Sequence, residues 1–285
     1  MDDRAAKIAA MANSVIYDAE ATHDYIDGAP HVKHASLRAL YGNLVVDIFD
    51  RALKHTSVPE VLDLGAGEGS ATLPFLELGA RVTAVDVSES QLATLREKCT
   101  AYTGMLGAEC RDVFETLHHF RDTGQRFDIV VANSFLHHVP DYLALTRDSL
   151  SVLSEHGQFF SFQEPLWHDS LGAFTRRFSN IAYLSWRIFK GDRLAGFKRR
   201  LRRSKGIYLE DSPEDNAEYH AVREGIDQDA LMELFTRSNL DYKFVRYFST
   251  QNKVFQFIGS LLGTKNTFAI ISRNPVDNGN SPQAS

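Results

Sequence analysis

The sequence has few cysteines and no long apolar run. Its 285 residues include only Cys99 and Cys110, and the close Cys and His spacing of a zinc motif is missing. This scarcity is typical of a protein from a reducing compartment and argues against a cysteine-bound metal. No run approaches the roughly 20 apolar residues of a membrane span, and residues 1–15 lack the apolar core of a signal peptide. We therefore expect a cytoplasmic protein.

An excess of positive charge is also missing. The net charge of −6 argues against a general nucleic-acid partner, although the charges are unevenly distributed. Apolar residues make up 44% of the chain, which is enough for a full hydrophobic core. The length favours one domain with an insertion over two domains.

Strand-like and helix-like segments alternate over the first half of the chain. We expect strands at residues 58–64, 81–87, 108–113, 127–133 and 157–162, with helices at 70–78, 89–103 and 142–153 between them. The alternation stops for roughly sixty residues and resumes with a helix at 228–238 and strands at 242–249 and 267–273. This order predicts a mostly parallel α/β sheet that frames a large insertion.

The stretch VLDLGAGEGSA, residues 61–71, places glycines at 65, 67 and 69 directly after a strand. Glycines at such a turn let backbone N–H groups approach a nucleotide. The dinucleotide fingerprint needs a third glycine at position 70, which is Ser70 here, although Asp86 fits its acidic position. The combination of Asp63 with G-x-G-x-G resembles the first motif of class I S-adenosylmethionine-dependent methyltransferases. NAD binding remains a minor alternative.

The resemblance covers residues 58–165 well and the terminal strands more loosely. It implies a Rossmann-like, seven-stranded, mostly parallel sheet with helices on both faces, an N-terminal helical lid and a helical cap inserted after the fifth strand. The corresponding segments are 1–57 for the lid, 58–164 for the cofactor-binding core, 165–227 for the basic cap, 228–274 for the rest of the core and 275–285 for a mobile tail.

The resemblance also assigns roles to residues that follow the strands. Asp86 is expected to accept the ribose hydroxyls, Asp112 the adenine amino group, and Asn133 to lie at the methionine end of the cofactor. The implied residues for S-adenosylmethionine, and for its product S-adenosylhomocysteine, are Asp63, Gly65, Ala66, Gly67, Asp86, Val87, Asp112, Val113 and Asn133. If these acids were instead ordinary strand-end residues in solvent, their order after three successive strands would be a coincidence.

The donor carries an activated methyl group, so a hydroxyl acceptor needs mainly alignment and a base near neutral pKa. His137 and His138 in NSFLHHVPD follow the fourth strand, at the edge where open α/β folds bind ligands. Adjacent side chains on a helical turn point in different directions, so one is expected to be catalytic and one structural, and we favour His138 as the base. A pair that only packs or caps a helix is the alternative.

A second candidate region follows the fifth strand. Glu164, Trp167 and His168 emerge in QEPLWHD, where His168 beside an acid could serve as a base and Glu164 could bind acceptor hydroxyls or a divalent cation. Alternatively, Glu-Pro simply ends the strand. In the predicted lid, Tyr17, Tyr25, His31 and His34 are the polar candidates for acceptor binding, and the sequence suggests no firm metal site there.

The insertion is strongly basic in its first half. Residues 176–205 hold eleven Lys or Arg residues and a single acid, Asp192, with apolar residues at near-helical spacing. This pattern predicts an amphipathic cap that contacts an anionic membrane or an anionic acceptor. The acidic segment 210–218 could instead neutralise it, within one chain or across a homodimer.

Three functional hypotheses follow. The leading one is an O-methyltransferase that acts on a sugar, glycan or comparable small metabolite with a histidine base; GAPHVKH, residues 28–34, resembles segments of bacterial methyltransferases of glycan and glycolipid assembly. The second is an N- or C-methyltransferase for a small or lipid-like acceptor. The third is a cofactor-binding regulatory homologue without turnover.

Overall fold

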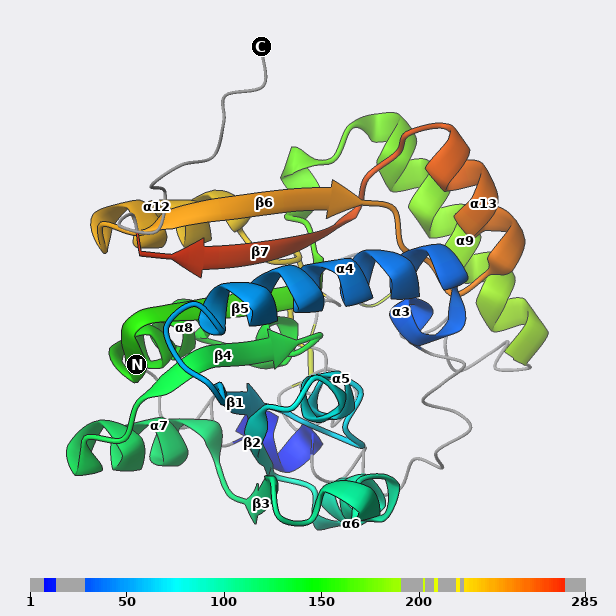
Figure 1. Ribbon diagram of the computed structural model, residues 1–285. Helices are drawn as coiled ribbons and strands as arrows, with labels where there is room; N and C mark the ends of the chain where they lie inside the picture. The colour runs from blue at the N-terminus through cyan, green and yellow to red at the C-terminus, as the bar shows by residue number, and fades with distance from the viewer. Residues whose placement is uncertain are drawn as a thin grey trace.

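The computed structural model describes residues 8–13, 29–190, 202, 208–209, 219–220 and 223–274. Seven strands form one sheet in the order β3-β2-β1-β4-β5-β7-β6 (Figure 1). Their bounds are β1 Glu60–Leu64, β2 Arg81–Asp86, β3 Leu106–Cys110, β4 Phe127–Asn133, β5 Leu153–Pro165, β6 Asp241–Tyr247 and β7 Thr267–Arg273. The first five strands pair in parallel, and β7 pairs antiparallel with both β5 and β6. The predicted Rossmann-like, mostly parallel sheet is confirmed.

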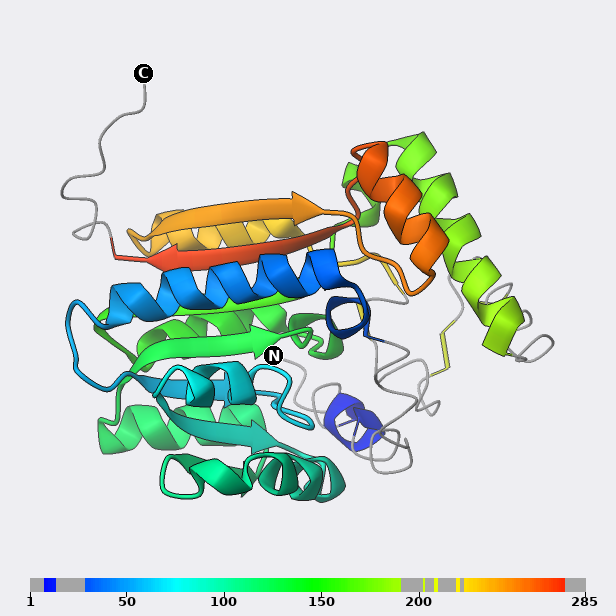
Figure 2. The same cartoon turned by 45° about the vertical axis from the view of Figure 1, so that its right-hand side comes forward.

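Helices cover both faces of the sheet (Figure 2). One apolar cluster joins the sheet to α4 (Ala35–Ala52), α5 (Thr72–Glu77) and α6 (Glu89–Lys98), and a second joins it to α7 (Val113–Thr123), α8 (Tyr142–Ser151) and α12 (Gln228–Arg237). Along β1, Val61 belongs to the first cluster and Leu62 to the second. Alternate side chains of a strand point to opposite faces, so two-sided burial explains why the strands read as continuous apolar runs.

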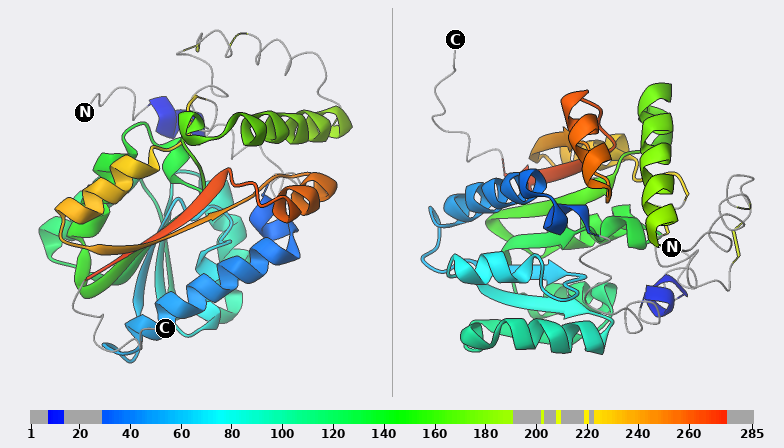
Figure 3. Two further views of the ribbon diagram at one scale, coloured as in Figure 1. Left: turned by 90° about the horizontal axis from the view of Figure 1, so that it is seen from above. Right: turned by 90° about the vertical axis from the view of Figure 1, so that its right-hand side faces the viewer.

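The remaining elements are short or lie at the edge of the fold. They are α3 (Pro30–Lys33), the 3-10 turns η1 (Thr100–Tyr102), η2 (Leu136–His138) and η3 (His168–Ser170), and the helices α9 (Ala173–Lys190) and α13 (Lys253–Leu261). Seen from above and from the side, α9 and α13 project together beyond one end of the sheet (Figure 3). Within the described ranges, no helix combines the length and the apolar character needed to cross a bilayer.

Two expected boundaries need correction. The third strand ends at Cys110 and not at residue 113. The Asp112 carboxylate accepts hydrogen bonds from the N–H groups of Phe114 and Glu115, and this cap begins the helix α7 at Val113. The helix α7 was not predicted from the sequence. The segment assigned to a lid, residues 1–57, includes α4, which packs on the sheet through Leu44, Ile48 and neighbouring apolar residues. This part of the segment is therefore core, while most residues before Ala29, and the predicted tail 275–285, lie outside the described ranges.

Candidate functional site

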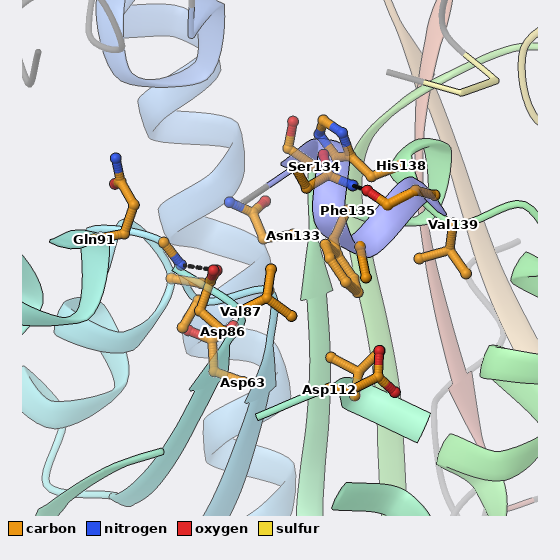
Figure 4. A pocket seen from close by; sticks show the side chains of 18 of the residues that line it. Asp63, Asp86, Val87, Gln91, Asp112, Asn133, Ser134, Phe135, His138 and Val139 are labelled. Atoms are coloured by element: carbon orange, nitrogen blue, oxygen red, sulfur yellow. Dashed lines mark hydrogen bonds between the residues drawn. The ribbon is translucent and has the colours of Figure 1, made fainter. Parts of the chain in front are cut away.

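The principal pocket opens at the carboxyl ends of β1, β2 and β4, the edge where parallel α/β sheets bind ligands (Figure 4). The structure brings all the residues predicted for the cofactor to its wall: Asp63, Gly65, Ala66, Gly67, Asp86, Val87, Asp112, Val113 and Asn133. These residues come from four strand ends that are up to seventy residues apart in the sequence. Their contacts with a cofactor remain a prediction, but the arrangement is the one that the resemblance requires.

The glycine loop turns sharply between β1 and α5. Gly65 has a φ of +68°, and the N–H groups of Gly65 and Ala66 both donate to the Val85 carbonyl of the neighbouring strand β2. A Cβ at position 65 would lie 2.1 Å from Cδ2 of Phe135, which lines the same pocket. Glycine is required here for two independent reasons, the left-handed backbone and the approach of an aromatic ring.

Gly65→Ala should therefore lower the free energy of unfolding by about 2–3 kcal/mol, because the strained backbone costs about 1 kcal/mol and the displaced ring the rest. Urea unfolding measures this loss. The matched control is Gly124→Ala, since Gly124 has a φ of +77° with open space around the added Cβ. Equal losses in the two variants would show that the approach of Phe135 has no energetic weight.

Asp86 ends β2 and holds the loop from the side. Its Oδ2 accepts the N–H of Gly67 at 2.8 Å (Figure 4). Its Oδ1 accepts the N–H of Ser88 at 2.9 Å. Each carboxylate oxygen can accept more than one hydrogen bond. The carboxylate is thus oriented by two backbone donors and presented to the pocket that it lines.

Asp63 is the buried acid of the site. Its side chain is 1% exposed, its Oδ2 pairs with the Thr72 hydroxyl at 2.6 Å, and its Oδ1 is buried without a hydrogen-bond partner among the described residues. Burial, reinforced by the nearby charge of Asp86, raises the pKa of Asp63 to about 7. An unsatisfied carboxylate oxygen at the wall of a pocket favours a cationic or hydrogen-bond-donating ligand group there.

The raised pKa of Asp63 predicts a pH-dependent stability. From about pH 4 to pH 7, the unfolded chain has lost this proton while the folded chain keeps it. The free energy of unfolding therefore falls as the pH rises through this range, and the fall levels off above pH 7. Asp63→Asn, which does not ionise, should lack this component. Thermal melting of both proteins measures this effect: as the pH rises from 5 to 8, the Tm of the variant should rise by several degrees relative to the Tm of the unchanged protein. A difference that is constant over this range would contradict the assignment.

Glu164 fixes the turn that follows β4. Its carboxylate is fully buried and accepts the N–H groups of Phe135, Leu136 and His137, with Oε1 serving the first two at 2.9 and 3.0 Å. The other oxygen, Oε2, also lies 2.8 Å from Nδ1 of His137. The predicted binding of an acceptor hydroxyl or a divalent cation by Glu164 is therefore corrected, because its oxygens face η2 rather than the pocket.

The two histidines of η2 take different positions. The His137 ring is bound to Glu164, whereas His138 lines the pocket with Phe135 and Val139 (Figure 4). The turn is held from the other side by His220, whose backbone N–H donates to the His137 carbonyl at 2.7 Å and whose Nε2 donates to the Pro140 carbonyl at 3.0 Å. His137 thus contacts Glu164 while His138 faces the pocket, and the catalytic role of His138 stays a prediction.

Asn133 and His31 form a polar contact beside the pocket. The Asn133 amide nitrogen lies 3.4 Å from Nε2 of His31, and the ring of His31 lies among the aromatic rings of Tyr41 and Phe162. Burial lowers the pKa of His31 to about 4, so this imidazole is neutral at physiological pH. A neutral ring can accept a hydrogen bond from the Asn133 amide and leave the amide oxygen, which is buried and unpartnered among the described residues, for a ligand.

Of the other predicted acceptor residues, those that the structure describes do not line this pocket. Nε2 of His34 donates to the Thr250 carbonyl at 2.7 Å, which ties α4 to the loop after β6. His168 begins η3, where burial lowers its pKa, and the N–H of Trp167 donates to Gln228 at 3.1 Å. Tyr17 and Tyr25 lie outside the described residues. Across the parts of the chain that are described, no three His, Cys, Asp or Glu side chains are grouped to hold a metal ion.

Sequence reasoning missed several residues of the pocket. Gln91 lies in the first turn of α6, five residues after Asp86, and the residues Ala9, Ala10 and Asn13 reach the pocket from a short helical segment at residues 8–13. Gln91 could have been found from its place just inside the helix that follows the acidic strand end. The N-terminal residues carry no chemical signal of their own.

Comparisons with known proteins agree with this architecture. Residues 61–157 match the family model of a methyltransferase domain. A ubiquinone biosynthesis O-methyltransferase of Coxiella burnetii (strain Dugway 5J108-111) is 31% identical over 100 residues, which are 35% of this chain and 41% of that protein. A second such enzyme, from Methylobacterium sp. (strain 4-46), is 29% identical over 101 residues. The chain thus spans less than half of the length of these curated relatives.

Solved structures extend the likeness to the whole fold. The magnesium protoporphyrin IX methyltransferase of Synechocystis PCC 6803 with bound SAH has a TM-score of 0.52 at 14% identity, with 95% of this chain and 100% of that one covered. The N-methyltransferase NodS of Bradyrhizobium japonicum WM9, in complex with S-adenosylhomocysteine, has a TM-score of 0.50 at 12% identity, with 96% and 100% covered. The fold is thus the Rossmann-like fold of these solved methyltransferases. Residues 61–157, which include the glycine loop and most of the pocket, are similar to a methyltransferase domain.

Proposed function

We propose that the protein transfers a methyl group from S-adenosylmethionine to a hydroxyl group of a small acceptor. The observation that supports this most directly is the pocket itself, where the glycine loop, Asp86, Asp112 and Asn133 surround one space at the carboxyl edge of the sheet. The match of residues 61–157 to a methyltransferase domain supports the same assignment.

The residues of the pocket fit the parts of this cofactor. The Asp86 carboxylate, already oriented by backbone donors, is suited to the two ribose hydroxyls, and Val87 beside it offers an apolar surface to the adenine. Asp112 uses Oδ1 to cap α7, which leaves its second oxygen for the adenine amino group. The orphaned oxygens of Asp63 and Asn133 suit the methionine ammonium.

The cofactor supplies a methyl group on a positively charged sulfur, which leaves as a neutral thioether once the methyl has moved. The protein has three tasks: to hold the acceptor in line with this methyl, to exclude water, and to take the hydroxyl proton. Among the histidines predicted as bases, His138 lines the pocket and is held there by a turn that Glu164 and His220 fix. We therefore propose that the imidazole of His138 is the base that takes up the hydroxyl proton of the acceptor.

The hydroxyl acceptor is supported by the names of the curated relatives, which are O-methyltransferases. Their similarity covers only 100 residues, which are 35% of this chain, so the acceptor class does not follow from it. A sugar or glycan remains our prediction for the acceptor, and a hydroxylated compound of ubiquinone biosynthesis is what the relatives' names suggest. Transfer of labelled methyl to a matched panel of sugars, phenols and amines distinguishes these classes, and transfer to amines alone would contradict the proposal.

Calorimetric titration tests the cofactor. The protein should bind S-adenosylmethionine and S-adenosylhomocysteine, and Asp86→Ala should weaken both about 100-fold, because two hydrogen bonds to a charged acceptor are lost at about 1.5 kcal/mol each. The control is Glu89→Gln, which changes an exposed acid three residues away that pairs with Arg96. Binding of NADH without binding of S-adenosylmethionine would overturn the assignment.

A further inference from the structure

The helix α13 carries an outward-facing apolar stripe. Val254, Phe257, Ile258, Leu261 and Leu262 recur at the spacing of one helix face, and Phe257 and Leu261 are 71% and 76% exposed. The opposite face meets the molecule: Gln256 and Gly259 are buried, and a Cβ on Gly259 would lie 2.3 Å from the ring of Phe248. The orientation of α13 is thus fixed, with its apolar face turned away from the core.

The helix α9 extends this surface. The Phe178 ring contacts the rings of Phe248 and Phe255 at centroid distances of 5.5 Å, and Asn252 donates to the Ser185 hydroxyl. Phe174 and Ile181, which are 60% and 54% exposed, lie about one turn before and one turn after Phe178 on the same face of α9. The two helices lie side by side at the end of the molecule (Figures 1 and 2). We call these exposed apolar residues of α9 and α13 the apical face.

Within the two helices that carry the apical face, the charged residues are all positive. The helix α9 contains Arg176 and Arg177 and has no acidic residue, and residues 242–274 contain no Asp or Glu at all. Lys253 and Lys265 stand at the two ends of the α13 segment and are exposed. The chain as a whole carries a net charge of −6, so this local excess of positive charge is not a general property of its surface.

We propose that the apical face docks on the surface of an anionic lipid bilayer, with the α13 stripe buried among the acyl chains and the lysines and arginines at the phosphate level. Exposed apolar side chains flanked by cations and free of acids are the composition of helices that lie in a membrane interface. A second copy of the chain fits less well, because an isologous contact would bring the same cations together. The proposal is independent of the proposed methyl transfer.

Flotation with vesicles tests this surface. The full-length protein should float with vesicles of phosphatidylcholine containing about 30% phosphatidylglycerol, and much less with phosphatidylcholine alone. The double variant Phe257→Ser and Leu261→Ser should lower the bound fraction at least tenfold, since two of the most exposed apolar side chains are removed. Lys253→Glu with Lys265→Glu should abolish the preference for anionic vesicles, and high salt should do the same for the unchanged protein.

The matched control replaces Val46 and Leu53, each 43% exposed and outside the apical face, by Ser. It should bind as the unchanged protein does, and melting curves should show that all variants remain folded. The proposal is overturned if the unchanged protein does not float, or if the Phe257 and Leu261 double variant floats equally well. It is also overturned if sedimentation shows a dimer that this double variant converts to a monomer.

Discussion

Replacing His138 by Gln should lower kcat by about 10²–10⁴, the range that a positioned general base contributes. Gln keeps the polarity and roughly the size of the side chain but cannot take up a proton at neutral pH. The ring of His138 lines the pocket, and its turn is held by backbone contacts that the substitution leaves in place. Affinity for S-adenosylmethionine should change little, so the loss appears in the chemical step.

Single-turnover transfer of labelled methyl, followed as a function of pH, measures this effect. The unchanged enzyme should lose activity as the pH falls, because a protonated base cannot accept the hydroxyl proton, and His138→Gln should show a flatter profile. His118→Gln is the control, since His118 lies on α7 and pairs with Asp148 at the surface. If turnover by the His138 variant matches that of the control, the base lies elsewhere or the acceptor needs none.

Replacing Glu164 by Ala should lower the free energy of unfolding by about 3–5 kcal/mol, which is the cost of leaving buried donors without their charged acceptor. Three backbone N–H groups and Nδ1 of His137 depend on this carboxylate, which is fully buried. Urea unfolding should show the loss, and the control Glu115→Ala on the exposed side of α7 should cost less than about 1 kcal/mol.

Glu164→Gln distinguishes a positioning role from simple packing. The amide keeps the volume and one acceptor oxygen but presents an NH₂ group to one set of backbone donors. We expect it to recover about half of the lost stability and to leave kcat impaired, because η2 would hold His138 less firmly. A stable Glu164→Ala protein, or a Gln variant with full activity, would show that the turn is held by other contacts.

The strand-end residues that line the pocket could be found from the sequence because their signals are local. Each strand ends in a residue with distinct chemistry, such as Asp63, Asp86 or Asn133, and parallel strands bring their carboxyl ends to one edge. The apolar runs of the strands were equally easy to recognise in the sequence, since strands buried on both faces contain few polar residues. The seven-stranded, mostly parallel sheet then followed from the class resemblance, whereas the strand order came from the structure.

The acceptor side was less accessible because its contacts are long-range. Glu164 looked like a free acid at a strand end, and only the fold shows that it binds a turn 27 to 29 residues away in the sequence. His220 acts across 80 residues on Pro140, and His34 across 216 residues on Thr250. The helix α13 was not predicted from the sequence. It is a short apolar segment between two strands, and its pattern does not indicate which of its sides faces solvent.

The position of β7 has a consequence for how the molecule is assembled. The last strand that the structure describes is inserted between β5 and β6, and its residues Phe268, Ala269 and Ile270 are fully buried. During synthesis, β5 and β6 emerge from the ribosome before their shared neighbour does. Until Arg273 has left the exit tunnel, β5 therefore keeps an open hydrogen-bonding edge, and both apolar clusters lack the side chains that β7 contributes to them. The sheet is thus completed only after β5 and β6 have both been synthesised, and a nascent chain must protect the edge of β5 until β7 has emerged.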